Sequence, residues 1–215
     1  LCYQLPGVIE ADRETGLALV VSPLISLMED QVQSLKNKGV AAGCLHSNQS
    51  ETQWREVIQQ IYRGELSMLY VSPERMAAAS FRKVLKEIPL SFAVIDEAHC
   101  ISQWGHDFRK DYRKLTYLKN TLGLPVMAVT ATATPSVLED IQARLKMKDP
   151  LLIRGSFRRE NLRFSLEYLR KDEQRMERTI QLLKERDMEK MGTGRALIYC
   201  ATRKKVTSVA EQLKE

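Results

Sequence analysis

The stretch FAVIDEAH, residues 92–99, runs from four apolar residues directly into two carboxylates. Continuous apolar character over Phe92 to Ile95 is typical of a strand buried on both faces of a parallel sheet. A carboxylate at the end of such a strand is costly unless a partner compensates its charge. Asp96 can hold Mg²⁺ against nucleotide phosphates while Glu97 polarises the attacking water. The alternative is that both acids cap the following helix.

Apolar runs alternate with amphipathic runs on both sides of this stretch. The pattern predicts strands over residues 17–21, 40–45, 67–71, 92–95 and 126–129. It predicts helices over residues 24–38, 51–63, 80–87, 111–122 and 135–145. Continuous apolar strands separated by helices indicate an α/β fold, with a parallel sheet covered by helices on both faces. Ligands of such sheets bind at the carboxyl ends of the strands, where the acid pair lies.

The character of the sequence changes near residues 149–150, where a polar and basic segment begins. Beyond it the pattern predicts a strand, a charged helix and another strand, over residues 162–168, 172–188 and 196–200. These elements are the opening of a second α/β unit. The expected organisation is a first domain over residues 1–150, a linker over 151–161 and a second domain over 162–215.

Composition sets limits on the class of protein. The 215 residues are 44% hydrophobic and 28% charged, a balance that allows a buried core. A net charge of +6 permits nucleic-acid binding without requiring it. The four cysteines have no paired spacing, which favours reduced thiols over a metal site. No apolar run approaches the length of a membrane span, so a cytosolic protein is expected.

A second motif follows the acids directly, in SQWGHDFR at residues 102–109. Trp104 and Phe108 offer flat faces on which bases stack, worth about 1–3 kcal/mol per base whatever the sequence. Arg109 can reach a phosphate or the nucleotide. The alternative places both aromatic rings in the core, but His106 and its polar, turn-prone neighbours favour an exposed loop.

Residues 96–109, DEAHCISQWGHDFR, resemble the Walker B motif and the aromatic-rich loop of the RecQ family of DNA helicases. Further segments resemble that family's motifs Ia, Ib, III and IV, in the family's order: SPLISLMEDQ at 22–31, YVSPER at 70–75, AVTATAT at 128–134 and ALIYCATR at 196–203. The resemblance covers essentially the whole chain. The aromatic loop distinguishes this family from most other helicases.

The resemblance implies two RecA-like domains and an ATP-dependent 3′–5′ DNA helicase that acts in recombination, repair and replication. It implies ATP and Mg²⁺ as cofactors and single-stranded or partially duplex DNA as the partner. The location would be the bacterial nucleoid, or the nucleus of a eukaryote. In this family the aromatic loop, with Trp104, His106, Phe108 and Arg109, senses DNA and communicates with the ATP site.

Other site residues follow from the same resemblance. His99 and Gln103 are expected to relay between DNA and ATP, although an isolated histidine is more often structural. Thr130 and Thr132 would link the nucleotide state to domain movement, or would cap the next helix.

Ser22, Ser72 and Arg203 are candidates for DNA contact. Ser22 and Ser72 each follow a strand, where hydroxyls and free amides suit phosphates. A Ser-Pro turn is their alternative. Arg203 would contact DNA or simply begin a solvated helix.

One expected motif is missing. ATP-driven helicases need the pattern G-x-x-x-x-G-K-[ST], yet no Gly-Lys pair occurs in the sequence. In the resembled family Leu-Cys-Tyr-Gln-Leu-Pro, here residues 1–6, directly follows that loop. We therefore expect Gly-Lys-Ser immediately before Leu1, and further motifs, including an arginine finger, after the last residue. Since losing that finger costs about 10³–10⁵ in rate in related enzymes, these 215 residues alone should neither hydrolyse ATP nor unwind DNA appreciably.

Two other functions remain open from the residues. An RNA helicase of the broader DEAH-bearing superfamily would share the acid pair, although the aromatic loop argues against it. A non-enzymatic DNA-binding or interaction module would need no phosphate loop.

Overall fold

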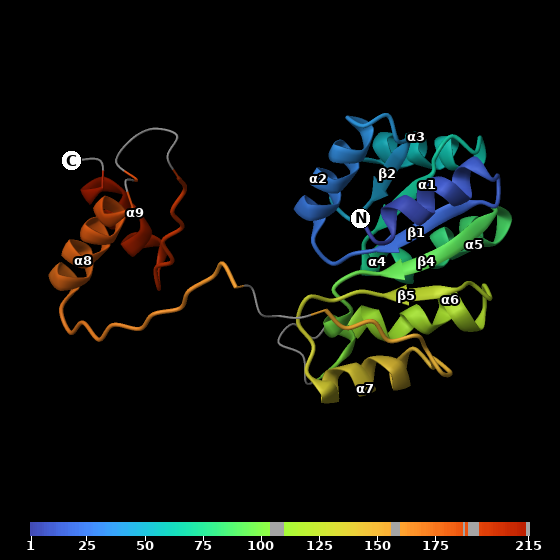
Figure 1. The fold of residues 1–215 in the computed structure, drawn as a ribbon. Helices are drawn as coiled ribbons and strands as arrows, with labels where there is room; N and C mark the ends of the chain where they lie inside the picture. The colour runs from blue at the N-terminus through green and yellow to red at the C-terminus, as the bar shows by residue number, and fades with distance from the viewer. Residues whose placement is uncertain (104–109, 156–159, 187, 189–193, 214–215) are drawn as a thin grey trace. The chain divides into compact units, whose positions relative to one another are not determined.

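The computed structural model describes residues 1–103, 110–155, 160–186, 188 and 194–213 (Figure 1). The chain divides into two compact units, Leu1–Leu152 and Ile153–Glu215. The first unit carries the acid pair and the buried core, and the second carries two helices.

The first unit is built on a five-stranded sheet in the order β2-β3-β1-β4-β5. Its strands are β1 Leu17–Val21, β2 Ala42–Leu45, β3 Met68–Val71, β4 Leu90–Ile95 and β5 Val126–Ala128. Every pairing is parallel, so all five carboxyl ends lie on one edge. The register sets Val21 beside Ile95, and Ile95 beside Ala128. The end of β4 therefore lies between the ends of β1 and β5 on this edge.

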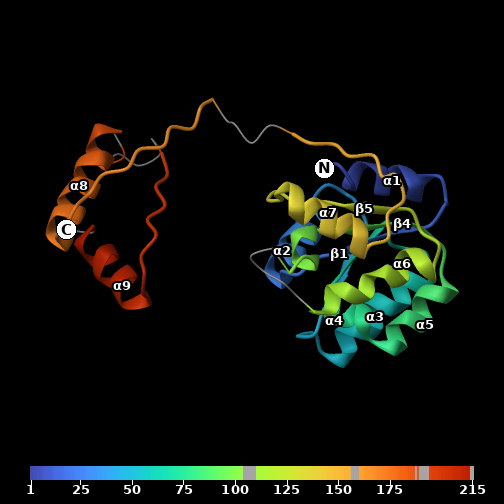
Figure 2. The same cartoon turned by 90° about the horizontal axis from the view of Figure 1, so that it is seen from below.

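Helices cover both faces of the sheet (Figures 1 and 2). They are α1 Gln4–Asp12, α2 Ile25–Lys36, α3 Glu51–Tyr62, α4 Pro73–Ala77, α5 Ala79–Glu87, α6 Thr116–Asn120 and α7 Pro135–Arg144, with 3₁₀ turns η1 Ala98–Ile101 and η2 Lys110–Leu115. Strand β1 shows why two covered faces are needed, because all its residues are buried. Leu19 belongs to the hydrophobic cluster on one face, and Val20 to the cluster on the other.

The sequence predicted this α/β architecture, and the RecA-like parallel sheet is confirmed. Helix α1 was not predicted. Pro6 is tolerated because it lies in the first turn, where its missing N–H costs no hydrogen bond. Gly7 allows α1 to approach the sheet, since a Cβ there would lie 3.1 Å from the Cβ of Ala18. The helix expected over residues 111–122 is instead η2 followed by the short α6.

The second unit contains α8 Asp172–Glu185 and α9 Arg203–Gln212. The strands predicted over residues 162–168 and 196–200 are wrong, because neither segment is a strand in the structure. A strand requires a paired neighbour for its backbone groups, and among the described residues neither segment has one. The side chains of Phe164 and Tyr168 are consequently exposed. Both oxygens of Glu167 accept hydrogen bonds of 2.7 Å from Arg178 of α8, which holds the first segment to this helix.

Within the described residues, no helix combines the length and the apolar character that a membrane span requires.

Candidate nucleotide and DNA site

Polar side chains from three strand ends lie close together on the carboxyl edge of the sheet. Ser22 follows β1, Asp96 follows β4 and Thr130 comes two residues after β5. The Ser22 hydroxyl donates to Oδ2 of Asp96 over a long 3.4 Å, and the backbone N–H of Glu97 donates to Oδ1 at 3.0 Å. Both carboxylate oxygens of Asp96 therefore face hydrogen-bond donors.

Asp96 is partly buried. Burial raises the pKa of its carboxyl group, and the nearby charge of Glu97 adds to this rise. The hydrogen bonds from Glu97 N–H and Ser22 oppose the shift, but burial prevails and the pKa stays above the ordinary aspartate value. The hydroxyl of Tyr112, a buried residue, donates to the backbone oxygen of Asp96 at 3.1 Å. No sequence pattern pointed to Tyr112, which lies 16 positions away.

Glu97 has an unusual backbone conformation. Its φ of 46° and ψ of 47° lie in the left-handed region, which a residue with a Cβ adopts only at a cost. It precedes η1 without a capping hydrogen bond from its side chain, so the capping alternative is not supported for Glu97. In the described part of the chain neither Glu97 nor Asp96 is paired with lysine or arginine. The side chain of Glu97 is 29% exposed, which leaves it accessible to solvent.

His99 connects the ends of two neighbouring strands. Its Nδ1 lies 3.0 Å from Oγ1 of Thr130 and 3.2 Å from Oε2 of Glu97. Oγ1 of Thr130 also accepts the backbone N–H of Thr132 at 3.3 Å. Capping of α7 falls to Thr134, whose hydroxyl accepts from the N–H of Val137. The structure thus brings together His99 and Thr130. The relay expected of His99 and Gln103 stays a prediction, as does the link to domain movement expected of Thr130 and Thr132.

The predicted DNA contacts are placed less favourably. Ser22 and Ser72 are buried, and the Ser72 hydroxyl accepts the N–H of Arg75 as the N-cap of α4. This geometry favours the structural alternative for Ser72, and its DNA contact stays a prediction. Gln103, which was predicted as a relay, is exposed in the first unit, and Arg203 begins α9 in the second unit. Trp104, His106, Phe108 and Arg109 lie outside the described residues.

The site suits a magnesium–nucleotide complex better than a protein-only metal centre. Among the described residues no group of three or more histidine, cysteine or acidic side chains could hold a metal ion. Mg²⁺ is commonly bound by one or two carboxylates together with phosphates and water. Asp96 offers such a carboxylate, and a cation would stabilise the charge that burial penalises.

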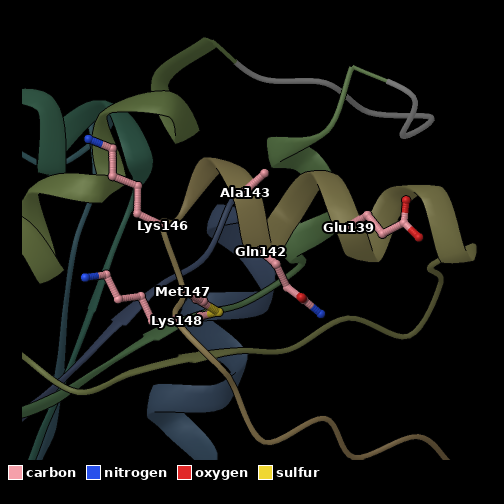
Figure 3. Close-up of a pocket in the computed structure, with 6 residues that line it drawn as sticks. All are labelled: Glu139, Gln142, Ala143, Lys146, Met147 and Lys148. Atoms are coloured by element: carbon pink, nitrogen blue, oxygen red, sulfur yellow. The ribbon is translucent and has the colours of Figure 1, made fainter.

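Two pockets lie away from the acid pair. One, of about 470 Å³, is lined by the last turns of α7 and the residues after it, including Glu139, Lys146 and Lys148 (Figure 3). The other, of about 560 Å³, lies beside α2 and the end of β2, where Cys44 and His46 line it. Neither pocket includes a residue predicted for the site. The chemistry expected at Asp96 is therefore not assigned to an enclosed cavity.

Comparison with known proteins agrees with this arrangement of motifs. Residues 1–141 match the family model described as DEAD/DEAH box helicase. The chain belongs to that family. Over 215 residues it is 41% identical to the ATP-dependent DNA helicase RecQ of Pasteurella multocida (strain Pm70), covering 100% of this chain and 32% of that protein. The resemblance to RecQ helicases is thereby confirmed.

Other helicases are similar over the same span. The probable ATP-dependent DNA helicase RecS of Bacillus subtilis (strain 168) is 41% identical over 216 residues, covering 100% of this chain and 41% of the relative. The ATP-dependent helicase SGS1 of Saccharomyces cerevisiae (strain ATCC 204508 / S288c) is 35% identical over 219 residues, covering 99% of this chain and 15% of SGS1. This DEAD/DEAH box chain thus spans well under half the length of these relatives.

A solved structure shows the same fold at low sequence identity. The Pyrococcus furiosus Hef helicase domain superposes with a TM-score of 0.52 and 15% identity, covering 93% of this chain and 43% of that chain. This likeness concerns the fold alone.

Proposed function

We propose that the protein is an ATP-dependent 3′–5′ DNA helicase of the RecQ type, acting in recombination, repair and replication at the nucleoid or in the nucleus. The observation that carries the proposal is the arrangement of Asp96, Glu97 and His99 after β4, at the carboxyl edge of the parallel sheet. Membership of the DEAD/DEAH box helicase family and the RecQ relatives support it.

Each residue of the acid pair has a separate task in this proposal. Asp96 would hold Mg²⁺, which when bound neutralises charge on the nucleotide phosphates. Glu97 would orient the attacking water and accept its proton, a role that suits a carboxylate accessible to solvent and free of lysine or arginine pairs in the described residues. His99 would hold Glu97 in place. Its hydrogen bond to Thr130 would connect Glu97 to the segment that follows β5.

DNA would lie along the same edge of the first unit. Helix α2 begins three residues after Ser22, so its first turn offers backbone N–H groups at this edge. Phosphate contacts of this kind hold a strand without reading its sequence. The aromatic rings of Trp104 and Phe108 are proposed to stack on bases of single-stranded or partially duplex DNA.

The Glu97→Gln substitution tests the catalytic assignment. ATP hydrolysis is measured in the full-length protein with saturating single-stranded DNA, because these residues contain no Gly-Lys-[ST] loop. Glutamine keeps the shape of the side chain but cannot accept the proton. The turnover number should fall by roughly 10²–10⁴ while KM for ATP stays nearly constant.

Glu139→Gln is the matched control, since Glu139 is exposed on α7 and lies outside the site. It should hydrolyse ATP as the wild type does. A Glu97→Gln protein with wild-type turnover would refute the assignment of the general base. Stimulation by single-stranded RNA equal to that by DNA would instead favour an RNA helicase.

A further inference from the structure

A single side chain covers the outer edge of the sheet at β2. This strand is the outermost one of the described sheet, where it pairs with β3 on one side. The Gln49 carboxamide lies against the other side. Its Oε1 accepts the backbone N–H of His46 at 3.0 Å, and its Nε2 donates to the backbone oxygen of Cys44 at 2.9 Å. One side-chain amide thus satisfies two backbone groups at the end of β2.

The two backbone groups that Gln49 binds face away from β3. In a parallel strand, the N–H and C=O groups of successive residues point alternately toward the two sides of the strand. The backbone oxygen of Leu45 accepts the N–H of Ser72, so the groups of Leu45 face β3. Cys44 and His46 lie on either side of Leu45 in the sequence, and their backbone groups therefore point outward.

The Gln49 carboxamide reproduces the bonding of a further strand. In a parallel sheet, a residue opposite Leu45 would donate its N–H to the oxygen of Cys44 and accept the N–H of His46. Gln49 supplies the same donor and the same acceptor from a side chain. It reaches both groups because it lies in the loop between β2 and α3, three residues beyond His46. A strand that approached this edge would find these two groups already bonded.

Other protection of this edge is weak. Exposed strand edges are commonly protected by charged side chains or proline, because unpaired N–H and C=O groups invite pairing with another strand. Strand β2 has the sequence AGCL, which contains neither. The space beside it is open, since the pocket of about 560 Å³ next to α2 is lined by Cys44, His46 and Gln49. Protection of the carboxyl end of β2 therefore depends on the Gln49 amide.

We propose that Gln49 closes the β2 edge to strand addition, and that its loss lets this edge pair with the same edge of a second copy of the chain. Identical edges related by a two-fold axis make a self-complementary contact, in which the two β2 strands run antiparallel. The inference does not rest on the proposed function, because it involves neither the nucleotide nor DNA.

Gln49→Leu tests the proposal, because it removes both hydrogen-bonding atoms and keeps the approximate size of the side chain. The full-length wild type and variant are compared by sedimentation velocity over a range of concentrations. Self-association of the variant should be roughly tenfold tighter than that of the wild type, or more, because two backbone groups in each copy are freed. Gln49→Ala, which adds no apolar surface, should act alike. Hydrogen exchange should show new protection over residues 42–46 in the associated variants.

Gln33→Leu is the matched control. Gln33 is exposed and lines the same pocket, but its amide donates to Asn37, one turn further along α2. This variant should associate no more than the wild type does. Gln49 variants that associate no more than the wild type, equal association of Gln33→Leu, or association without protection of residues 42–46 would each overturn the inference. Loss of protection throughout the sheet in both Gln49 variants would show that Gln49 only stabilises the fold, which would also overturn it.

Discussion

At Asp96 the protein holds a carboxylate where burial opposes its charge and hydrogen bonds favour it. Burial wins, so the folded protein binds this proton more readily than the unfolded chain does. Between the two pKa values the unfolded state binds fewer protons, and stability therefore increases as pH falls through the raised value. Below the ordinary aspartate pKa this contribution stops changing. Asp96 thus destabilises the fold at neutral pH, which is typical of a residue kept for function.

Asp96→Asn should reveal this contribution as a dependence on pH. The free energy of unfolding is measured with urea for wild type and variant, from neutral pH down to mild acid. The variant has no proton to gain at this position. Its stability minus that of the wild type should therefore decrease as pH falls through the raised pKa.

Asp140→Asn provides a control of opposite sign. Burial alone would raise the pKa of Asp140, but the Ser102 hydroxyl and the Arg144 guanidinium, 2.6 Å away, lower it. The wild type therefore loses stability as pH falls through the lowered pKa. The free energy of unfolding of Asp140→Asn minus that of the wild type should increase as pH falls. A difference for Asp96→Asn that grows in acid would contradict the raised pKa.

Single residues could be singled out from the sequence where charge follows an apolar run, and their roles stay predictions. Asp96 and Glu97 stood out because a carboxylate at the end of a buried strand requires a partner for its charge, and the structure does place them directly after β4. The contact between His99 and Thr130 was not predicted, because the two residues are 31 positions apart and meet only through the pairing of β4 and β5. Tyr112 was missed because a tyrosine among charged residues resembles any surface aromatic.

At the scale of helices and strands, the alternation of apolar and amphipathic runs predicted the elements of the first unit. It did so because each strand there is paired with a neighbour and covered by helices, which requires apolar residues on both faces. The five strands and the longer helices follow the expected order to within a few residues. Helix α1 was missed because Pro6 and Gly7 break the helical pattern, and only the close approach to Ala18 explains the glycine. The two strands expected in the second unit are absent for the converse reason. Apolar sequence favours an extended chain, but a strand forms only where its backbone groups pair with a neighbouring strand.

Helix α3 shows how strongly local sequence specifies an element. Ser50 and Gln53 form a capping box, with the Ser50 hydroxyl accepting from Gln53 N–H at 3.3 Å and Gln53 Oε1 accepting from Ser50 N–H at 3.0 Å. Ser50→Ala should lower the free energy of unfolding in urea by about 1 kcal/mol. Ser47→Ala, in the same loop but outside the box, should change it little. Equal losses in the two variants would show that the capping box is not the cause.

At the scale of the whole chain, stability is unevenly divided. The buried hydrophobic residues of the described chain all fall between Tyr3 and Leu145, in the first unit. The second unit exposes large apolar side chains, among them Phe164 and Leu197. The sequence predicted a linker over residues 151–161, whereas the division into two compact units falls after Leu152. The domain boundaries therefore stay a prediction.

Residues 1–152 should fold without the second unit. Urea unfolding is followed by tryptophan fluorescence and circular dichroism. The midpoint for residues 1–152 should match the midpoint of the cooperative unfolding transition of the 215-residue chain. Residues 153–215 alone should unfold without a cooperative transition, because burial of apolar surface supplies most of the driving force for folding. A sharp transition in that second piece would show that it has a core of its own. A large drop in the midpoint of residues 1–152 would show that the first unit depends on the second.

The left-handed backbone at Glu97 sets its proposed catalytic role against the stability of the fold. Glycine adopts this conformation without the steric cost, so a laboratory search for heat-resistant variants would find replacement of Glu97 attractive. Each such heat-resistant variant would lack the carboxylate that is proposed to accept the proton of the attacking water. If the proposed role of Glu97 holds, selection for thermal stability alone would favour inactive variants, so a screen has to measure ATP hydrolysis together with stability.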